Sequence, residues 1–139
     1  TYESLSDGGF ATGSMLGSGG FIVYNDTTCI VRNTWNFSRF YHHESCGQCT
    51  PCREGKGWLE KVLHRIENGH GREEDIELLW SIQSKIEGNT ICPLGDAASW
   101  PVAAAIRHFR DEFEYHIRFP EKVKNRDHFV AEPFSSIKK

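Results

Sequence analysis

Hydrophobic residues recur every three or four positions through the middle of the chain, which is the spacing of an amphipathic helix. The first such stretch follows a cap at Asp26 or Thr27 and runs to about Tyr41. The second starts with Thr50 as cap and Pro51 in the first turn, where proline's missing amide proton costs no hydrogen bond. We therefore predict two helices in this part of the chain.

The second helix should end at Gly69, and a third should run from about Arg72 to Gly88. A short turn joins the two, so they should form an antiparallel pair. The third helix opens on three acidic residues, which complement the helix dipole and are not read as a catalytic group: Glu73, Glu74 and Asp75.

A fourth helix is predicted from Ala97 to about Arg110, with Pro101 lying in its first turns or kinking them. A further helical stretch is expected over residues 111–118. Together these elements predict a mainly α fold, a small helical bundle in which the connecting loops that carry cysteines meet at one end.

The two ends of the chain lack this periodicity. Residues 1–20 carry six glycines, and Phe21 to Tyr24 is expected to be a strand. Dinucleotide-binding glycines follow a strand and open a helix. The glycines here precede the expected strand, so they predict a turn or packing loop instead. After Pro120 we expect an extended tail. The predicted divisions are the end of a preceding domain over 1–26, a helical domain over 27–119 and a tail over 120–139.

Composition excludes several classes of function. The net charge of −3 argues against nucleic acid as a partner, because phosphate binding needs a basic face. No run approaches the roughly 18 apolar residues of a membrane span. The chain starts at Thr1 without a signal peptide and reads like the middle of a protein, so we expect a fragment.

Cysteines carry the strongest chemical signal. Cys46, Cys49 and Cys52 follow a C-x2-C-x2-C pattern, and the helical pair after them returns the chain so that Cys92 can join them. This three-plus-one spacing favours a [4Fe-4S] cluster, with a single zinc ion as the alternative, because structural zinc sites more often use two separate C-x2-C pairs. An odd total of five cysteines disfavours a disulfide framework. Cys29, within the first predicted helix, is interpreted as a small buried hydrophobe.

Four thiolates around a cluster form an anionic group that needs nearby positive charge and amide donors. Arg53 and Lys56 could supply the charge, or could simply lie on a solvated helix face. For His42 and His43 the simpler interpretation, without a role at the cluster, is favoured. The chain shows no pairing of a nucleophile with a base, so the chemistry it predicts is one-electron transfer.

Two motifs extend this argument to a family. Residues 44–55 (ESCGQCTPCREG) and 91–101 (ICPLGDAASWP) closely resemble the C-terminal part of the NADH-binding flavoprotein subunit of respiratory complex I, the 51 kDa or F subunit of NADH:quinone oxidoreductase. The likeness runs from about Gly13 to Phe113. Flavoprotein subunits of NAD-reducing hydrogenases and NAD-dependent formate dehydrogenases share the first motif, but the second, with residues 107–109 (RHF), favours complex I.

The resemblance implies a C-terminal four-helix-bundle domain whose [4Fe-4S] cluster takes electrons from NADH-reduced FMN and passes them toward further clusters and quinone. It implies that residues 1–26 end a β-grasp-like domain. The implied partners are other peripheral-arm subunits, especially the [2Fe-2S] 24 kDa-type subunit and the large iron-sulfur subunit, without membrane insertion. The implied location is the cytoplasmic side of the bacterial inner membrane, or the matrix side of the mitochondrial one. The implied ligands are Cys46, Cys49, Cys52 and Cys92.

One departure from the family limits the activity that we expect. Nothing in the sequence resembles the glycine-rich flavin loop of the family, so FMN and NAD(H) are expected only in a full-length subunit. The 139-residue polypeptide by itself should not oxidise NADH.

Overall fold

The computed structural model describes residues 22–124. The predicted glycine-rich loop and the tail beyond residue 124 lie outside this range. Five helices are found in the described part: α2 (Ile30–His43), α3 (Thr50–Glu67), α4 (Asp75–Ile86), α5 (Leu94–Arg118) and α6 (Pro120–Lys124).

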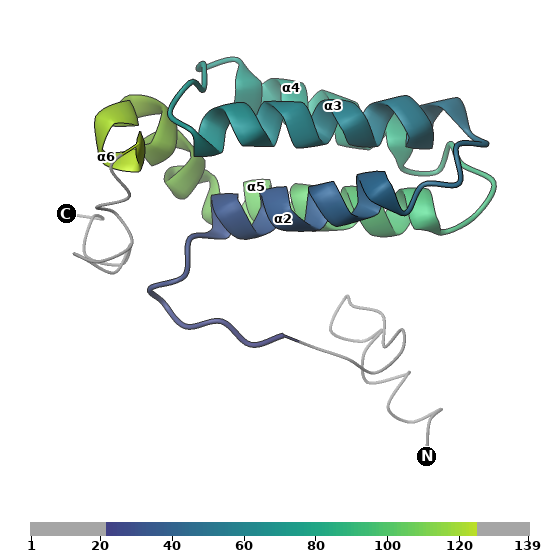
Figure 1. Cartoon of the computed structure of the whole chain (residues 1–139), viewed down its shortest axis with the longest axis horizontal. Coiled ribbons are helices and arrows are strands. Elements are labelled where there is room, and N and C mark those ends of the chain that lie inside the picture. Colours follow the sequence, from purple (N-terminus) through teal and green to yellow (C-terminus); the bar gives the residue numbers. More distant parts are fainter. Residues whose placement is uncertain (1–21, 125–139) are drawn as a thin grey trace.

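Helices α2 to α5 form a four-helix bundle (Figure 1). Both α2 and α4 pack against α3 and α5, so each long helix has two main neighbours. The apolar faces meet in one core, which includes Leu63 of α3, Leu79 of α4 and Phe113 of α5, all fully buried. The predicted mainly α fold is therefore confirmed.

The two helix ends assigned to glycine are also confirmed. Gly69 and Gly88 have φ values of 69° and 71°, in the left-handed region that favours glycine after a helix. The break near Arg110 is found at Phe109, where φ of −132° and ψ of 28° separate two helical segments of α5. Pro101 lies within the first of these segments.

The start of α2 was predicted wrongly. The residue that caps it is Cys29, whose sulfur accepts a hydrogen bond from the Arg32 amide, so Cys29 does not lie within the helix. Asp26 and Thr27 belong instead to a turn organised by Asn25, whose side-chain oxygen accepts from the Thr27 hydroxyl at 2.8 Å. The buried environment expected for Cys29 is confirmed, since only 3% of its surface is exposed.

Smaller differences occur at the other predicted boundaries. Cys49 is the residue before α3, so Thr50 is helical, and Pro51 lies in the first turn as predicted. Helix α4 starts at Asp75 and not near Arg72, because the Asp75 carboxylate accepts a hydrogen bond from the Arg72 amide and keeps the intervening residues in a turn. Helix α5 starts at Leu94, three residues before the predicted start at 97.

The predicted strand and tail differ more. Residues 22–24 have no regular secondary structure, and Val23 is 88% exposed. A strand requires a partner for its backbone hydrogen bonds, and none lies in the described range. Residues 120–124, expected to be extended, form α6 and bury Val123.

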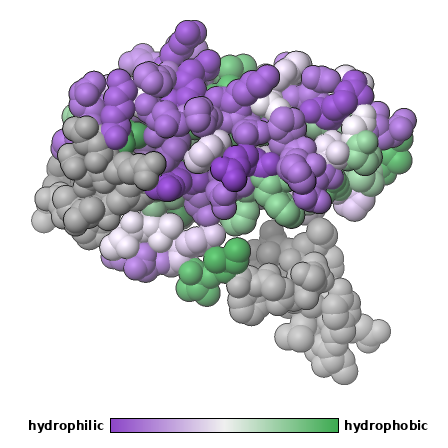
Figure 2. Space-filling view, in the orientation of Figure 1, coloured by the Kyte–Doolittle hydropathy of each residue, from purple (hydrophilic) through white to green (hydrophobic). Residues whose placement is uncertain are grey.

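The surface of the bundle is mainly hydrophilic on the face seen in Figure 2, with hydrophobic residues in smaller patches. Within residues 22–124 no helix has the length and apolar character that crossing a membrane would require.

Candidate functional site

The two cysteine-bearing loops lie at the same end of the bundle, on the right in Figure 1. Residues 44–49 connect α2 to α3, and residues 87–93 connect α4 to α5. The backbone amide of Ile91 donates a hydrogen bond to Cys49 Sγ, with a donor–acceptor distance of 3.5 Å. The loop that carries Cys92 therefore contacts the loop that carries Cys46 and Cys49, as the helical hairpin between them predicted.

The first loop is held by its own polar groups. Gly47 takes a φ of 80°, and its carbonyl accepts a hydrogen bond from Arg53 Nη1 at 2.7 Å. Ser45 Oγ lies 3.4 Å from Cys52 Sγ and accepts from the Gly47 amide at 3.3 Å. Hydroxyl and amide donors of this kind stabilise negative charge on sulfur.

The second loop is anchored to the start of α5. Asp96 accepts a hydrogen bond from the Gly88 amide at 2.7 Å, and the Thr90 hydroxyl donates to the Cys92 carbonyl at 3.0 Å. Gly95 packs tightly here, since a Cβ at this position would lie 2.8 Å from Thr90 Cβ. The position of Cys92 thus depends on contacts from both sides of its loop.

The four cysteines differ in exposure. Cys52 is buried, Cys49 is half-buried, and Cys46 and Cys92 are exposed. All four are free thiols in the structure. A group bound by them would therefore lie at the end of the bundle, with its inner side against Cys52 and its outer side toward the surface.

Lys56 provides an independent test of fit for an anionic group. It is 1% exposed, and its Nζ has no hydrogen-bond partner within residues 22–124. It lies one helical turn after Cys52, on the same side of α3, with Nζ 5.9 Å from the centre of the Tyr41 ring. The solvated-face interpretation is wrong for Lys56, and a buried ammonium one helical turn from the buried Cys52 matches the charge of a thiolate-bound cluster.

The other candidate cations have different surroundings. Arg53 is exposed and contacts the Gly47 carbonyl and Glu54, so it supports the loop. His42 is exposed, and its Nδ1 lies 2.6 Å from Glu60 Oε2. His43 is also exposed, and its Nδ1 lies 3.0 Å from Glu44 Oε1. These contacts agree with the simpler interpretation of the two histidines.

The spacing of the sulfurs bears on the choice between a cluster and one ion. A zinc ion with Zn–S bonds of about 2.3 Å holds its sulfurs about 3.8 Å apart. Over residues 22–124 the group of side chains identified as close enough to hold a single ion is a different one, Cys29, Glu112 and His116, and it includes none of the four cysteines. A [4Fe-4S] cluster spreads its ligands more widely, because each thiolate binds its own iron.

Sequence reasoning missed this second group. Its signal is a carboxylate and an imidazole four residues apart on one helix, which places them on the same face. Cys29 is 83 residues earlier than Glu112, so only the packing of α2 against α5 brings it to them.

Known proteins match most of the chain. The family described as the NADH-ubiquinone oxidoreductase-F iron-sulfur binding region matches residues 32–116, which include Cys46, Cys49, Cys52 and Cys92. The F subunit of NADH-quinone oxidoreductase of Rickettsia typhi is 54% identical over 113 residues, covering 81% of this chain and 25% of the relative. The corresponding F subunit of Mycobacterium bovis is 50% identical over 107 residues, covering 77% and 24%.

A solved structure agrees with the fold. An NAD+-reducing [NiFe]-hydrogenase, in its H2-reduced state, matches with a TM-score of 0.65 and 34% identity, over 68% of this chain and 17% of its own. The chain spans about a quarter of the length of the curated relatives it matches. On the family match over residues 32–116, this chain belongs to the NADH-ubiquinone oxidoreductase-F iron-sulfur binding region family.

Proposed function

We propose that Cys46, Cys49, Cys52 and Cys92 bind a [4Fe-4S] cluster, and that the chain is an electron-transfer domain of NADH:quinone oxidoreductase. The observation that carries the proposal is the hydrogen bond from the Ile91 amide to Cys49 Sγ, which joins the two cysteine loops. The three-plus-one spacing of the cysteines and the match to an iron-sulfur binding region favour a cluster over a single zinc ion, and the buried Lys56 would offset the negative charge that four thiolates bring.

The residues around the cysteines have distinct tasks in this proposal. Ser45 and the Ile91 amide supply hydrogen bonds to sulfur, and Arg53 fixes the loop through the Gly47 carbonyl. Lys56 supplies positive charge from the inner side. A bound [4Fe-4S] cluster supplies a carrier that exchanges one electron at a time.

In the whole oxidoreductase, we propose that electrons reach this domain from NADH-reduced FMN and leave toward further clusters and quinone. FMN and NAD(H) would bind elsewhere in a full-length subunit, and residues 1–26 would end the domain that precedes the cluster domain of 27–119. Other complex I subunits would be the partners, in particular the [2Fe-2S] 24 kDa-type subunit and the large iron-sulfur subunit. The site of action would be the cytoplasmic face of the bacterial inner membrane or its mitochondrial matrix counterpart.

Anaerobic reconstitution with iron and sulfide tests the cluster. About four irons per chain are expected, with an EPR signal on reduction. Cys92→Ser should lower the iron content and abolish or convert the signal, whereas the matched change Cys29→Ser should leave both intact. A wild-type chain that takes up about one zinc but no iron-sulfur cluster would support a zinc-stabilised structural domain instead.

The NADH-ferricyanide assay tests the proposed division of labour. The 139-residue polypeptide, loaded with its cluster, should show no NADH oxidation, with or without added FMN. Measurable activity would contradict the proposal that flavin and NADH bind elsewhere.

A subunit of an NAD-linked hydrogenase is the second candidate function, because the hydrogenase structure resembles this chain. It is disfavoured because the sequence identity to that hydrogenase is 34%, against 54% to the F subunit of Rickettsia typhi.

A further inference from the structure

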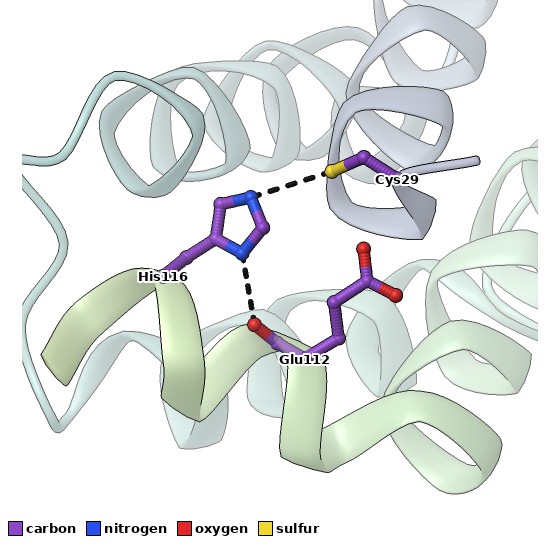
Figure 3. Close-up of side chains that lie close together, drawn as sticks. All are labelled: Cys29, Glu112 and His116. Carbon is purple, nitrogen blue, oxygen red and sulfur yellow. Dashed lines mark hydrogen bonds between the residues drawn. The ribbon is translucent and has the colours of Figure 1, made fainter. Parts of the chain in front are cut away.

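A second group of metal-ligating side chains is buried at the opposite end of the bundle from the cysteine loops. Cys29 caps α2, and Glu112 and His116 lie one turn apart on α5 (Figure 3). One ligand atom from each of the three lies within 4.8 Å of the others, and the residues are 3%, 4% and 0% exposed. Helix α2, with 14 residues and a length of about 21 Å, separates this group from the cysteine loops.

The hydrogen bond of His116 fixes which ring nitrogen can bind a metal. Its Nδ1 lies 2.9 Å from the backbone carbonyl oxygen of Glu112, and a carbonyl can only accept, so Nδ1 carries the proton. In the neutral ring, Nε2 then presents a lone pair, and this atom points at Cys29 Sγ from 3.3 Å (Figure 3). A histidine that donates its other N–H to a backbone carbonyl is the usual arrangement of a metal ligand.

Glu67, the last residue of α3, adds a fourth donor. Its Oε2 lies 3.6 Å from His116 Nε2 and 3.9 Å from Cys29 Sγ. Tetrahedral zinc bond lengths place sulfur and nitrogen about 3.6 Å apart, nitrogen and oxygen about 3.4 Å, and sulfur and oxygen about 3.6 Å. The three observed separations are each within a few tenths of an ångström of these values.

Without a cation, the charged forms of two of these groups are disfavoured. Burial, followed by the nearby charges of Glu112 and Glu67, raises the pKa of the Cys29 thiol far above its ordinary value. Burial is also the main cause that raises the pKa of the Glu112 carboxyl. A divalent cation bound at the centre of the group would displace the thiol proton of Cys29, because metal coordination deprotonates a thiol.

We propose that Cys29, Glu67, Glu112 and His116 form a mononuclear site for a divalent transition metal of the zinc type, separate from the iron-sulfur cluster. One sulfur, one imidazole nitrogen and carboxylate oxygens suit a borderline ion such as zinc. The site would tie together the start of α2, the end of α3 and the segment of α5 beyond its break at Phe109.

Metal analysis of the cluster-loaded full chain tests the proposal, because iron then occupies the other four cysteines. After incubation with Zn²⁺ and desalting, the wild-type chain should retain about one zinc in addition to its iron. Cys29→Ser and His116→Gln should lose at least most of this zinc with iron unchanged. His108→Gln, an exposed histidine on the same helix, is the matched control and should retain it.

X-ray absorption at the zinc edge of the wild-type chain keeps the test decisive where a variant fails to fold. One sulfur at about 2.3 Å, with nitrogen and oxygen at about 2.0 to 2.2 Å, supports the site. Absence of bound zinc in the cluster-loaded wild type, or a zinc shell made only of sulfur, overturns it. Retention of zinc by folded Cys29→Ser and His116→Gln chains also overturns it, and the iron content reports on the cluster separately.

Discussion

Replacing Lys56 by methionine should change the iron-free and the cluster-loaded chain in different ways. Methionine is unbranched and of similar length, so it fills the same space without the ammonium group. The variant therefore removes the charge of a side chain that is 1% exposed, whose Nζ has no hydrogen-bond partner in the described part of the chain.

In the iron-free chain the substitution should stabilise the fold. A buried polar group left without a partner costs about 1–3 kcal/mol, and more when it is charged. Removing that cost should raise the free energy of unfolding by about 1–3 kcal/mol. For a domain of about 100 residues this corresponds to an increase in Tm of about 4–8 °C for each kcal/mol.

In the cluster-loaded chain the substitution should lower the midpoint potential. Lys56 lies four residues after Cys52, an offset of about 6 Å along the helix. Because the charge of a bound cluster would lie beyond the Cys52 sulfur, we use a separation of roughly 8 Å between that charge and the ammonium. With an effective dielectric constant of about 20, one positive charge at that distance stabilises the reduced cluster by about 2 kcal/mol relative to the oxidised cluster. Loss of this stabilisation in Lys56→Met should lower the midpoint potential of the one-electron couple by about 90 mV.

Thermal unfolding followed by circular dichroism measures the first effect, and an EPR-monitored redox titration measures the second. Lys61→Met, an exposed lysine on the same helix, is the matched control and should change both quantities little. A Lys56→Met chain that is less stable without iron, or whose potential is unchanged or higher, would refute the reasoning that a buried, unpaired ammonium faces the cluster.

Three further substitutions test the packing that positions the site. Gly95→Ala would place a Cβ 2.8 Å from Thr90 Cβ, so we expect a loss of about 1–3 kcal/mol by denaturant unfolding together with a lower iron content. Asp75→Ala should cost about 2–3 kcal/mol, because this fully buried carboxylate accepts two hydrogen bonds from Arg65; an unchanged urea midpoint would contradict that role. Leu63→Ala, fully buried in the core, should lose about 2–5 kcal/mol in the same assay, and a loss below about 1 kcal/mol would argue against this core.

Much of the fold follows from local pattern. The periodicity of hydrophobic residues placed the four long helices, and Gly69 and Gly88 marked two of their ends because a left-handed residue after a helix favours glycine. The helical boundary near Arg110 was also evident from the sequence. These features depend on a few consecutive residues, so neighbouring residues suffice to predict them.

Errors arose where a distant residue decides the local structure. Helix α2 begins at Ile30 because the Ile30 amide donates to the Glu112 carboxylate at 2.6 Å, a partner 82 residues away. The strand expected over residues 21–24 has no partner for residues 22–24 in the described range, and no local pattern reveals that absence. The sequence left open whether Lys56 supplies charge to a cluster or lies on a solvated helix face, and the packing of the helices decides this by burying it.

The family and the candidate ligands can be read from the amino-acid sequence, because Cys46, Cys49 and Cys52 are close along the chain and their spacing is distinctive. Helix packing sets which other groups lie near them, above all the buried ammonium of Lys56. It also brings Cys29 to Glu112 and His116. The two kinds of information differ because spacing along one loop is set by covalent geometry, whereas contacts between α2, α3 and α5 depend on how whole helices pack.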